Sequence, residues 1–323
     1  MRSLLRVCGV AGLVLMCAAG PAAADDSGFT IKDPRIKESS GLAASRAHPG
    51  VYWTHNDSGD GAYVYAVDAK TGQTVARVTM EGVGRPRDVE AISIGPDGDL
   101  YVGDIGDNLD GSWSHVWIYR FHEPDRLGDQ TVKATQYVVQ YADGPRNAEA
   151  LMVHPKTGRV YIASKRESGG GLYEGPAKLS ASGTNVFHRV GEVPWVTDGA
   201  FSPDGTKLAL RGYFALAEYA WKGGTNPLGD WHAVPGTPVQ AQSESVTYTP
   251  DGAALMVGSE GADSDVVRVP LKEGGAKSPS AGGSSTDSGD GAGSGNYLLG
   301  AMVLAGAAVL GLGAKRVLRR RSG

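Results

Sequence analysis

The chain has 323 residues, of which 41% are hydrophobic and 20% are charged, and this composition is that of a folded globular protein, not a disordered one. The formal net charge is −4, but residues 25–272 hold 23 Lys and Arg against 32 Asp and Glu, which makes that stretch −9. The net negative charge of this stretch argues against nucleic-acid binding, which needs a cluster of basic residues. The chain has only two cysteines, Cys8 and Cys17, which excludes a disulfide framework.

The chain begins with the pattern of a secretory signal peptide. Arg2 and Arg6 precede an apolar run over Val7–Ala19, and the small residues of Pro21–Ala24 follow it. We therefore expect residues 1–24 to be removed, which leaves a mature chain without cysteine.

A repeat runs through residues 25–272. In five segments an apolar strand leads through a tight turn into a second strand, and the turn prolines are 47, 59, 48 and 47 residues apart. Pro-Asp-Gly between alternating apolar runs predicts a hairpin, and a period in the forties with short strands predicts a β-propeller. The five segments are Gly41–Asp57, Ala91–Asp104, Ala150–Lys165, Gly199–Arg211 and Ser245–Glu260.

Each repeat continues with two more strand-like runs, except the fifth, which supplies only Asp265–Leu271. We assign the strand-like segment Phe29–Lys37 to the last blade, where it joins the chain ends and closes the ring. The prediction is therefore an all-β, five-bladed β-propeller; the alternative is six blades, with the sixth hidden in the 59-residue interval. The further runs are Ala62–Ala69, Thr74–Met80, His115–Phe121, Thr135–Tyr141, Gly171–Leu179, Val186–Val193, Phe214–Trp221 and Trp231–Val234.

Alignment of the repeats places a polar residue at the start of each innermost strand, where it faces the central channel of a closed propeller. Three carboxylates in a narrow ring must become protonated, pair with cations or hold a metal. Carboxylate and hydroxyl oxygens suit a hard cation, and Ca²⁺ tolerates such a loose geometry. The alternative is a polar channel that holds water or pairs with arginines. The five residues are Ser40, Glu90, Glu149, Thr197 and Glu244.

The second strands end at the face where the first strands begin, so we expect their last residues at one mouth of the channel. A Pro-Arg motif also enters the first strands there, at Pro34–Glu38, Pro86–Glu90 and Pro145–Glu149. Basic groups above a carboxylate ring can clamp an anion such as phosphate, or they can simply neutralise the acids around them. The candidate mouth residues are Asp57, Asp104, Lys165 and Arg211, with Glu260 beside them and with Arg87 and Arg146 from the motif.

The C-terminal part of the chain has the pattern of a membrane anchor. Residues 273–296 are dominated by Gly, Ser and Ala and are predicted to form a flexible tether. Tyr297–Ala314 is an 18-residue run without a charge, long enough for one transmembrane helix. The basic tail, residues 315–323, is placed in the cytoplasm by the positive-inside rule, so we expect the body, residues 25–272, on the extracellular side of the cell membrane.

The predicted ring resembles that of the calcium-activated apyrases, five-bladed propellers that place Ser, Glu, Glu, Ser and Glu around a central Ca²⁺, with Thr197 here in place of one Ser. Val51–Gly59 and Leu100–Gly106 are similar to strands of that family's first two blades. The body also resembles secreted bacterial β-propellers of the WD40/YVTN-like class. The apyrase resemblance implies a bound Ca²⁺, but the catalytic Asp/Arg cluster of that family is not found in this chain, and no catalytic residue is assigned.

Three classes of function follow from these patterns. The first, which we expect, is a binding module whose channel mouth holds an unidentified extracellular ligand or partner protein above a calcium ion. The second is an apyrase- or phytase-like phosphohydrolase, in which Lys165, Arg211 and Arg146 offset charge while Asp57 or Asp104 orients water. The third is a glycosidase that uses Glu90 and Glu149 as paired carboxylates.

Overall fold

The computed structural model describes residues 28–109 and 111–271. The predicted signal peptide, tether, membrane helix and basic tail therefore lie outside the described residues. Within them, regular structure consists of strands, and no helix is long and apolar enough to cross a membrane.

The five hairpins predicted from the proline turns are confirmed. Each turn carries a glycine at positive φ, between 67° and 78°, a conformation that other residues rarely adopt. These glycines are Gly50, Gly98, Gly158, Gly205 and Gly252. The hairpins are β2 (Ala43–Ala44) with β3 (Val51–Thr54), β6 (Val89–Ile94) with β7 (Asp99–Asp104), β11 (Ala148–Val153) with β12 (Val160–Ser164), β15 (Asp198–Phe201) with β16 (Lys207–Arg211), and β19 (Ser243–Tyr248) with β20 (Ala254–Ser259).

Further strands extend each hairpin to an antiparallel unit of four, and we number the units 1 to 5 in the order of their innermost strands. Unit 1 gains β4 (Tyr63–Asp68) and β5 (Thr74–Glu81), and unit 2 gains β8 (Val116–His122) and β10 (Thr135–Tyr141). Unit 3 gains β13 (Gly170–Glu174) and β14 (Thr184–Val193), and unit 4 gains β17 (Leu216–Trp221) and β18 (Leu228–Ala233). Unit 5 gains β21 (Asp265–Pro270) and β1 (Phe29–Thr30).

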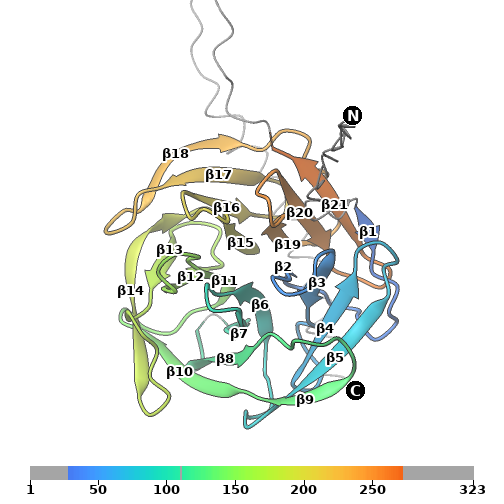
Figure 1. Cartoon of the computed structure of the whole chain (residues 1–323). Coiled ribbons are helices and arrows are strands. Elements are labelled where there is room, and N and C mark those ends of the chain that lie inside the picture. Colours follow the sequence, from blue (N-terminus) through green and yellow to red (C-terminus); the bar gives the residue numbers. More distant parts are fainter. Residues whose placement is uncertain (1–27, 110, 272–323) are drawn as a thin grey trace, which may run out of the picture.

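The units are arranged around a central axis, with β2, β6, β11, β15 and β19 nearest to it, which is the arrangement of a β-propeller (Figure 1). Buried apolar clusters fill the spaces between neighbouring units all the way round, including the space between units 5 and 1. Trp53 of unit 1 and Tyr119 of unit 2, both fully buried, belong to one such cluster. The core is therefore distributed between the sheets, and the channel is surrounded on all sides.

The N-terminal segment pairs with the last unit, as expected. Phe29 lies opposite Val266 in antiparallel register, Thr30 donates a hydrogen bond to Asp265 at 2.5 Å, and Ile31 N–H donates to Ser264 O at 2.9 Å. The strand itself is only two residues long, shorter than the predicted Phe29–Lys37, because the chain then turns to bury Ile36 between units 5 and 1.

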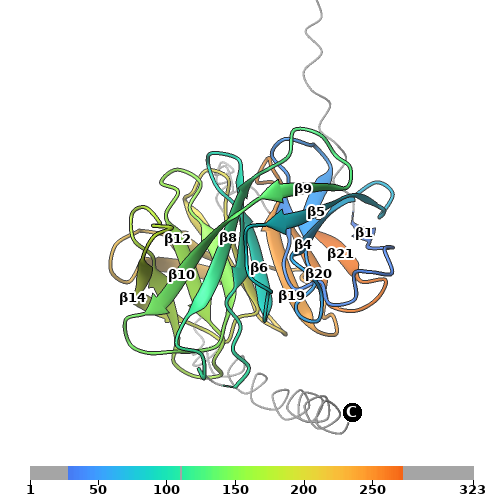
Figure 2. The same ribbon diagram turned by 90° about the horizontal axis from the view of Figure 1, so that it is seen from below.

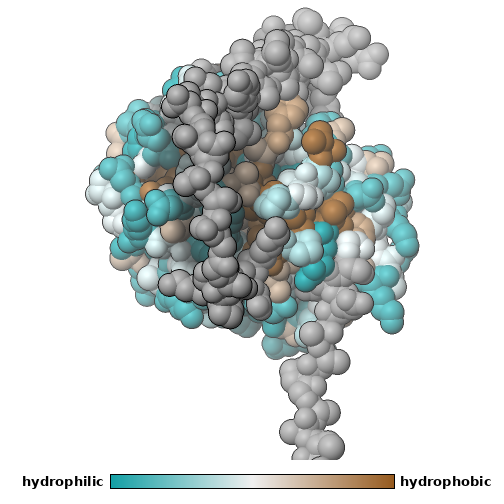
Figure 3. Space-filling view, turned by 90° about the horizontal axis from the view of Figure 1, so that it is seen from above, coloured by the Kyte–Doolittle hydropathy of each residue, from teal (hydrophilic) through white to brown (hydrophobic). Residues whose placement is uncertain are grey.

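Two parallel pairings link units at the rim. In the chain, β9 (Gln130–Lys133) lies between β8 and β10 of unit 2, but it pairs with β5 of unit 1, and Figure 2 shows the two strands side by side. β10 of unit 2 likewise pairs with β14 of unit 3. The pairing of β10 with β14 makes units 2 and 3 one sheet, and β9 ties a connecting segment of unit 2 to the sheet of unit 1. β9 occupies part of the long 59-residue interval. Hydrophilic residues dominate the outer surface in Figure 3, with apolar residues gathered near the middle of that view.

Candidate functional site

Three glutamates start the innermost strands of units 2, 3 and 5, and each lies at a break in the strand register. The pairing of β6 with β7 skips Glu90, that of β11 with β12 skips Glu149, and that of β19 with β20 skips Glu244. A β-bulge of this kind redirects one side chain out of the alternation of the strand. The same irregularity in three units therefore brings three carboxylates toward the channel end where the innermost strands begin.

Lys165, which follows β12, provides the positive charge of this group. Its Nζ lies 2.6 Å from Oε1 of Glu149, whose side chain is only 2% exposed. Burial opposes the charge on Lys165, but the nearby carboxylates of Glu149, Glu244 and Glu90 raise its pKa well above the usual value. One ammonium group thus stands among three carboxylates and forms its ion pair with Glu149.

The other two glutamates, Glu90 and Glu244, have no comparable ion pair with a basic side chain among the described residues. Ser40 donates a hydrogen bond to Oε2 of Glu90 at 3.0 Å, and burial together with Glu149 and Asp57 raises the Glu90 pKa well above its usual value. Burial also raises the pKa of Glu244 to about 8, against the opposing effect of Lys165. Oε2 of Glu244 is buried and has no hydrogen-bond partner among the described residues.

Thr197, the fifth member of the predicted ring, has a different role. Its hydroxyl donates to Ser243 O at 2.7 Å and so ties unit 4 to the start of β19. Asp198 next to it accepts the N–H of Val246 at 2.7 Å and strengthens the same link. The structure therefore brings Ser40, Lys165 and the three glutamates to one place. The Thr197 side chain instead links units 4 and 5 through its hydrogen bond to Ser243 O.

A second group of acids lies beside Glu90 and centres on Asp57, which follows β3. Carboxylate oxygens of Asp57, Asp88 and Glu90 lie within 4.8 Å of one another, and so do those of Glu38, Asp57 and Glu260. Burial and the charge of Asp88 raise the pKa of Asp57 to about 9, and Oδ1 of Asp57 has no hydrogen-bond partner among the described residues. We call these five residues, Glu38, Asp57, Asp88, Glu90 and Glu260, the acidic cluster.

Sequence reasoning assigned Asp57 and Glu90 to the site but did not assign Glu38 and Asp88 as ligands. Both belong to the repeated Pro-Arg motif, at Pro34–Glu38 and Pro86–Glu90. The motif was a usable signal, because a repeated loop that enters the innermost strands must pass the same end of the channel in each unit.

The predicted mouth residues Asp104, Arg87 and Arg146 are occupied by local contacts. Asp104 accepts hydrogen bonds from the Asp88 N–H at 2.9 Å and from the Tyr119 hydroxyl at 2.6 Å. The Arg87 guanidinium lies 4.0 and 3.8 Å from the ring centroids of two tryptophans, Trp113 and Trp117. Arg146 pairs with Asp143 at 2.5 Å and donates to Tyr173.

Arg211 is the remaining predicted mouth residue, and it is almost fully buried, with 1% exposure. One of its terminal nitrogens donates to Gln240 at 2.8 Å, and its Nε and NH1 have no partner among the described residues. Burial lowers its pKa to about 10 although Asp198 and Glu244 oppose this shift. Arg211 is therefore a buried positive charge near Asp198 and Glu244 and does not form an open clamp.

Comparison with known proteins gives no family. No model of a known protein family matches the chain, and no curated protein matches it. Among solved structures, the PQQ-bound aldose sugar dehydrogenase from Streptomyces coelicolor aligns with 75% of this chain and 96% of its own, at 14% identity and a TM-score of 0.43. A mitotic checkpoint complex aligns with 72% of this chain and 61% of its own, at 13% identity and a TM-score of 0.39. Hydrazine synthase from Kuenenia stuttgartiensis aligns with 68% and 61%, at 14% identity and a TM-score of 0.37.

Proposed function

We propose that this chain is a binding module, a propeller of five blades that correspond to units 1 to 5 and that binds Ca²⁺ at the acidic cluster. The observation that supports this most directly is the imbalance of buried charge. Lys165 forms its ion pair with Glu149, while Asp57, Asp88 and Glu90 converge from units 1 and 2. Oδ1 of Asp57 is buried and has no hydrogen-bond partner within residues 28–109 and 111–271. A divalent cation relieves that repulsion.

The donor atoms of the acidic cluster fit calcium. All are carboxylate oxygens, with the Ser40 hydroxyl next to Glu90, and oxygen ligands of this kind suit hard cations. Ca²⁺ accepts six to eight oxygens in flexible geometry, whereas Mg²⁺ demands a stricter octahedron. The proposed position differs from the centre of the five-residue ring, because Lys165 already supplies positive charge to Glu149 and Glu244 there.

The same contacts favour binding over phosphoryl transfer. A phosphate clamp needs basic groups that converge on one point, but Arg87 is held between two tryptophans and Arg146 by Asp143 and Tyr173. The ligand of the module is thus proposed to contact the cation and the carboxylates around it.

We further propose the extracellular, membrane-anchored placement that the sequence predicts. Extracellular calcium modules bind the ion with Kd values of about 10⁻⁴–10⁻³ M. The calorimetric Kd of the acidic cluster for Ca²⁺ is therefore expected in this range.

The test is calcium binding to the purified body, residues 25–272, by calorimetry and by melting in CaCl₂ or EDTA. Ligand at a hundredfold excess over Kd stabilises the folded state by about 2.7 kcal/mol, so CaCl₂ should raise the Tm. Asp57→Asn should abolish the rise and, in EDTA, should melt higher than the parent as pH rises through about 9, where the buried Asp57 carboxyl of the parent ionises. The exposed Asp125→Asn is the matched control and should behave as the parent does. Equal melting of the parent in CaCl₂ and EDTA would remove the basis for the proposal.

A further inference from the structure

A cavity of about 460 Å³ lies at the opposite end of the channel from the acidic cluster. It is lined by the last residues of the innermost strands and by the proline turns that follow them, from all five units. Glu90, Glu149 and Glu244 are each the second residue of such a strand, so most of the strand length separates the two sites. Pockets of 300–1,000 Å³ hold small molecules, and this one is within that range.

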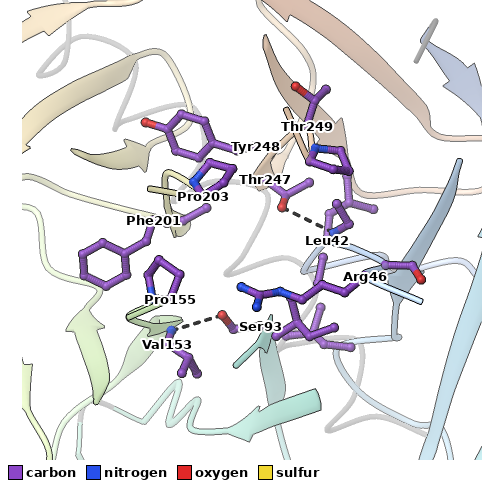
Figure 4. A pocket seen from close by; sticks show the side chains of 18 of the residues that line it. Leu42, Arg46, Ser93, Val153, Pro155, Phe201, Pro203, Thr247, Tyr248 and Thr249 are labelled. Atoms are coloured by element: carbon purple, nitrogen blue, oxygen red, sulfur yellow. Dashed lines mark hydrogen bonds between the residues drawn. The ribbon is translucent and has the colours of Figure 1, made fainter. Parts of the chain in front are cut away.

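The floor of the cavity is apolar. Most of the lining residues are apolar, among them Leu42, Ile92 and Val153. Figure 4 shows Pro155 and Pro203 beside the cavity, with the Phe201 ring directed away from its centre. Such a lining favours the hydrocarbon part of a ligand, because burial of apolar surface is worth about 25 cal/mol per Å².

Two basic side chains and two hydroxyl groups of the cavity are available as hydrogen-bond donors to a ligand. None of the residues that line it is Asp or Glu, and two, Arg46 and Lys156, are basic. The Ser93 hydroxyl accepts the N–H of Val153 at 3.1 Å, and the Thr247 hydroxyl accepts that of Ala44 at 3.5 Å. Each hydroxyl therefore retains its own O–H for donation. The polarity of this end is the reverse of that at the acidic cluster.

Arg46 extends its guanidinium toward the centre of the cavity in Figure 4. Burial lowers its pKa, while Asp97 and Glu123 raise it, but the side chain forms no ion pair in the part of the chain that the structure describes. Asp97 is paired with Arg120 at 2.6 Å, and Glu123 accepts hydrogen bonds from Trp53 at 2.7 Å and from the backbone N–H of Arg46 at 3.1 Å. The charge of Arg46 is therefore left for a ligand.

We propose that this cavity binds a small amphipathic anion, a carboxylate with an apolar body. The carboxylate contacts the Arg46 guanidinium, with Lys156 at the rim, and the hydrocarbon part lies on the apolar floor. The inference is independent of the calcium proposal, because it uses neither the acidic cluster nor a cation.

The test compares octanoate with octan-1-ol, which share the apolar body but differ in charge, by calorimetric titration of the body of the protein. Octanoate should bind at one site, and octan-1-ol should bind about tenfold more weakly or worse, since hydrogen bonds to charged groups contribute about 1.5–3 kcal/mol. Arg46→Met should reduce octanoate affinity about tenfold or more and leave octan-1-ol affinity unchanged.

Three controls separate this site from a general effect. Lys178→Met, a change at an exposed lysine outside the cavity, should bind octanoate as the parent does. Asp57→Asn should also bind octanoate normally, so that failure of the calcium site leaves this result intact. Arg46→Met should melt at the parental Tm, because the Arg46 side chain forms no ion pair among the described residues whose loss would destabilise the fold. Absence of octanoate binding, equal affinity for octanoate and octan-1-ol, or full octanoate affinity in Arg46→Met would overturn the proposal.

Discussion

Replacement of Lys165 by Met should destabilise the folded chain strongly, because this residue supplies the ammonium group that faces three buried carboxylates. The Lys165 side chain is 18% exposed, the Glu149 side chain is 2% exposed, and their charged atoms are 2.6 Å apart. Loss of one partner of a buried pair costs about 3–5 kcal/mol, since the other charge stays buried without compensation. For a body of this size, about 2–4 °C per kcal/mol converts that cost into a fall in Tm of about 6–20 °C.

The stability lost in Lys165→Met should depend on pH, because it depends on whether the three glutamates are charged. Glu149, Glu244 and Glu90 have pKa values above those of an unfolded chain, so each contributes stability that is lost as pH rises through its folded-state pKa. Lys165 offsets that loss by stabilising the charged carboxylates. The deficit of Lys165→Met should therefore be small near pH 5 and should grow as pH rises through about 8, the pKa of Glu244.

The assay is urea denaturation followed by circular dichroism in EDTA at pH 5, 7 and 9. The double variant Lys165→Met with Glu149→Gln should recover part of the loss, because both members of the pair are then neutral. Glu192→Gln is the matched control for the glutamate change, since its side chain is 84% exposed in a pair with Arg189 at 3.6 Å, and pairs of that kind contribute about 0–1 kcal/mol. A Lys165→Met deficit below about 1 kcal/mol at pH 9, or one equal at pH 5 and pH 9, would refute the reasoning.

Four other outcomes are expected. Calcium binding at pH 7 should release protons, because Asp57 has a pKa of about 9 and must lose its proton to bind the ion; equal binding enthalpies in buffers of different ionisation enthalpy would contradict this. Ile36→Ala should cost about 2–5 kcal/mol in urea denaturation, since the residue is fully buried between units 5 and 1, and an unchanged midpoint would show that the N-terminal segment adds nothing to closure. Protease added to intact cells should release a fragment that ends within residues 273–296, whereas protection until lysis would exclude the extracellular placement. The purified body should release little or no phosphate from nucleoside diphosphates with Ca²⁺; robust release abolished by Arg211→Ala would replace the binding module by the hydrolase.

The repeat made the hairpins and the position of the three glutamates predictable, because turn chemistry and apolar alternation are local properties of the chain. The bulges at Glu90, Glu149 and Glu244 were not predictable, since they depend on how two strands pair. Lys165 was assigned to the mouth, but its ion pair with Glu149 depends on the packing of the site after the ring closes.

Other misses have equally physical causes. The strand β9, Gln130–Lys133, is short and polar, and its stability comes from pairing with β5 about fifty residues earlier in the chain. Arg87 lies in the predicted motif, but its guanidinium lies against Trp113 and Trp117. The sequence around Arg87 does not predict these contacts.

The rim pairings β5 with β9 and β10 with β14 make the ring mechanically uneven. Units 2 and 3 form one sheet, and the segment β9 between two strands of unit 2 pairs with unit 1, whereas unit 5 ends in a two-residue strand, β1, paired with β21. A pulling force applied at Leu271, directly after β21, therefore acts first on the sheet with the shortest outer strand. In a single-molecule stretching experiment from that end, unit 5 should peel away at low force, unit 4 should follow, and units 1 to 3 should yield together in one larger step.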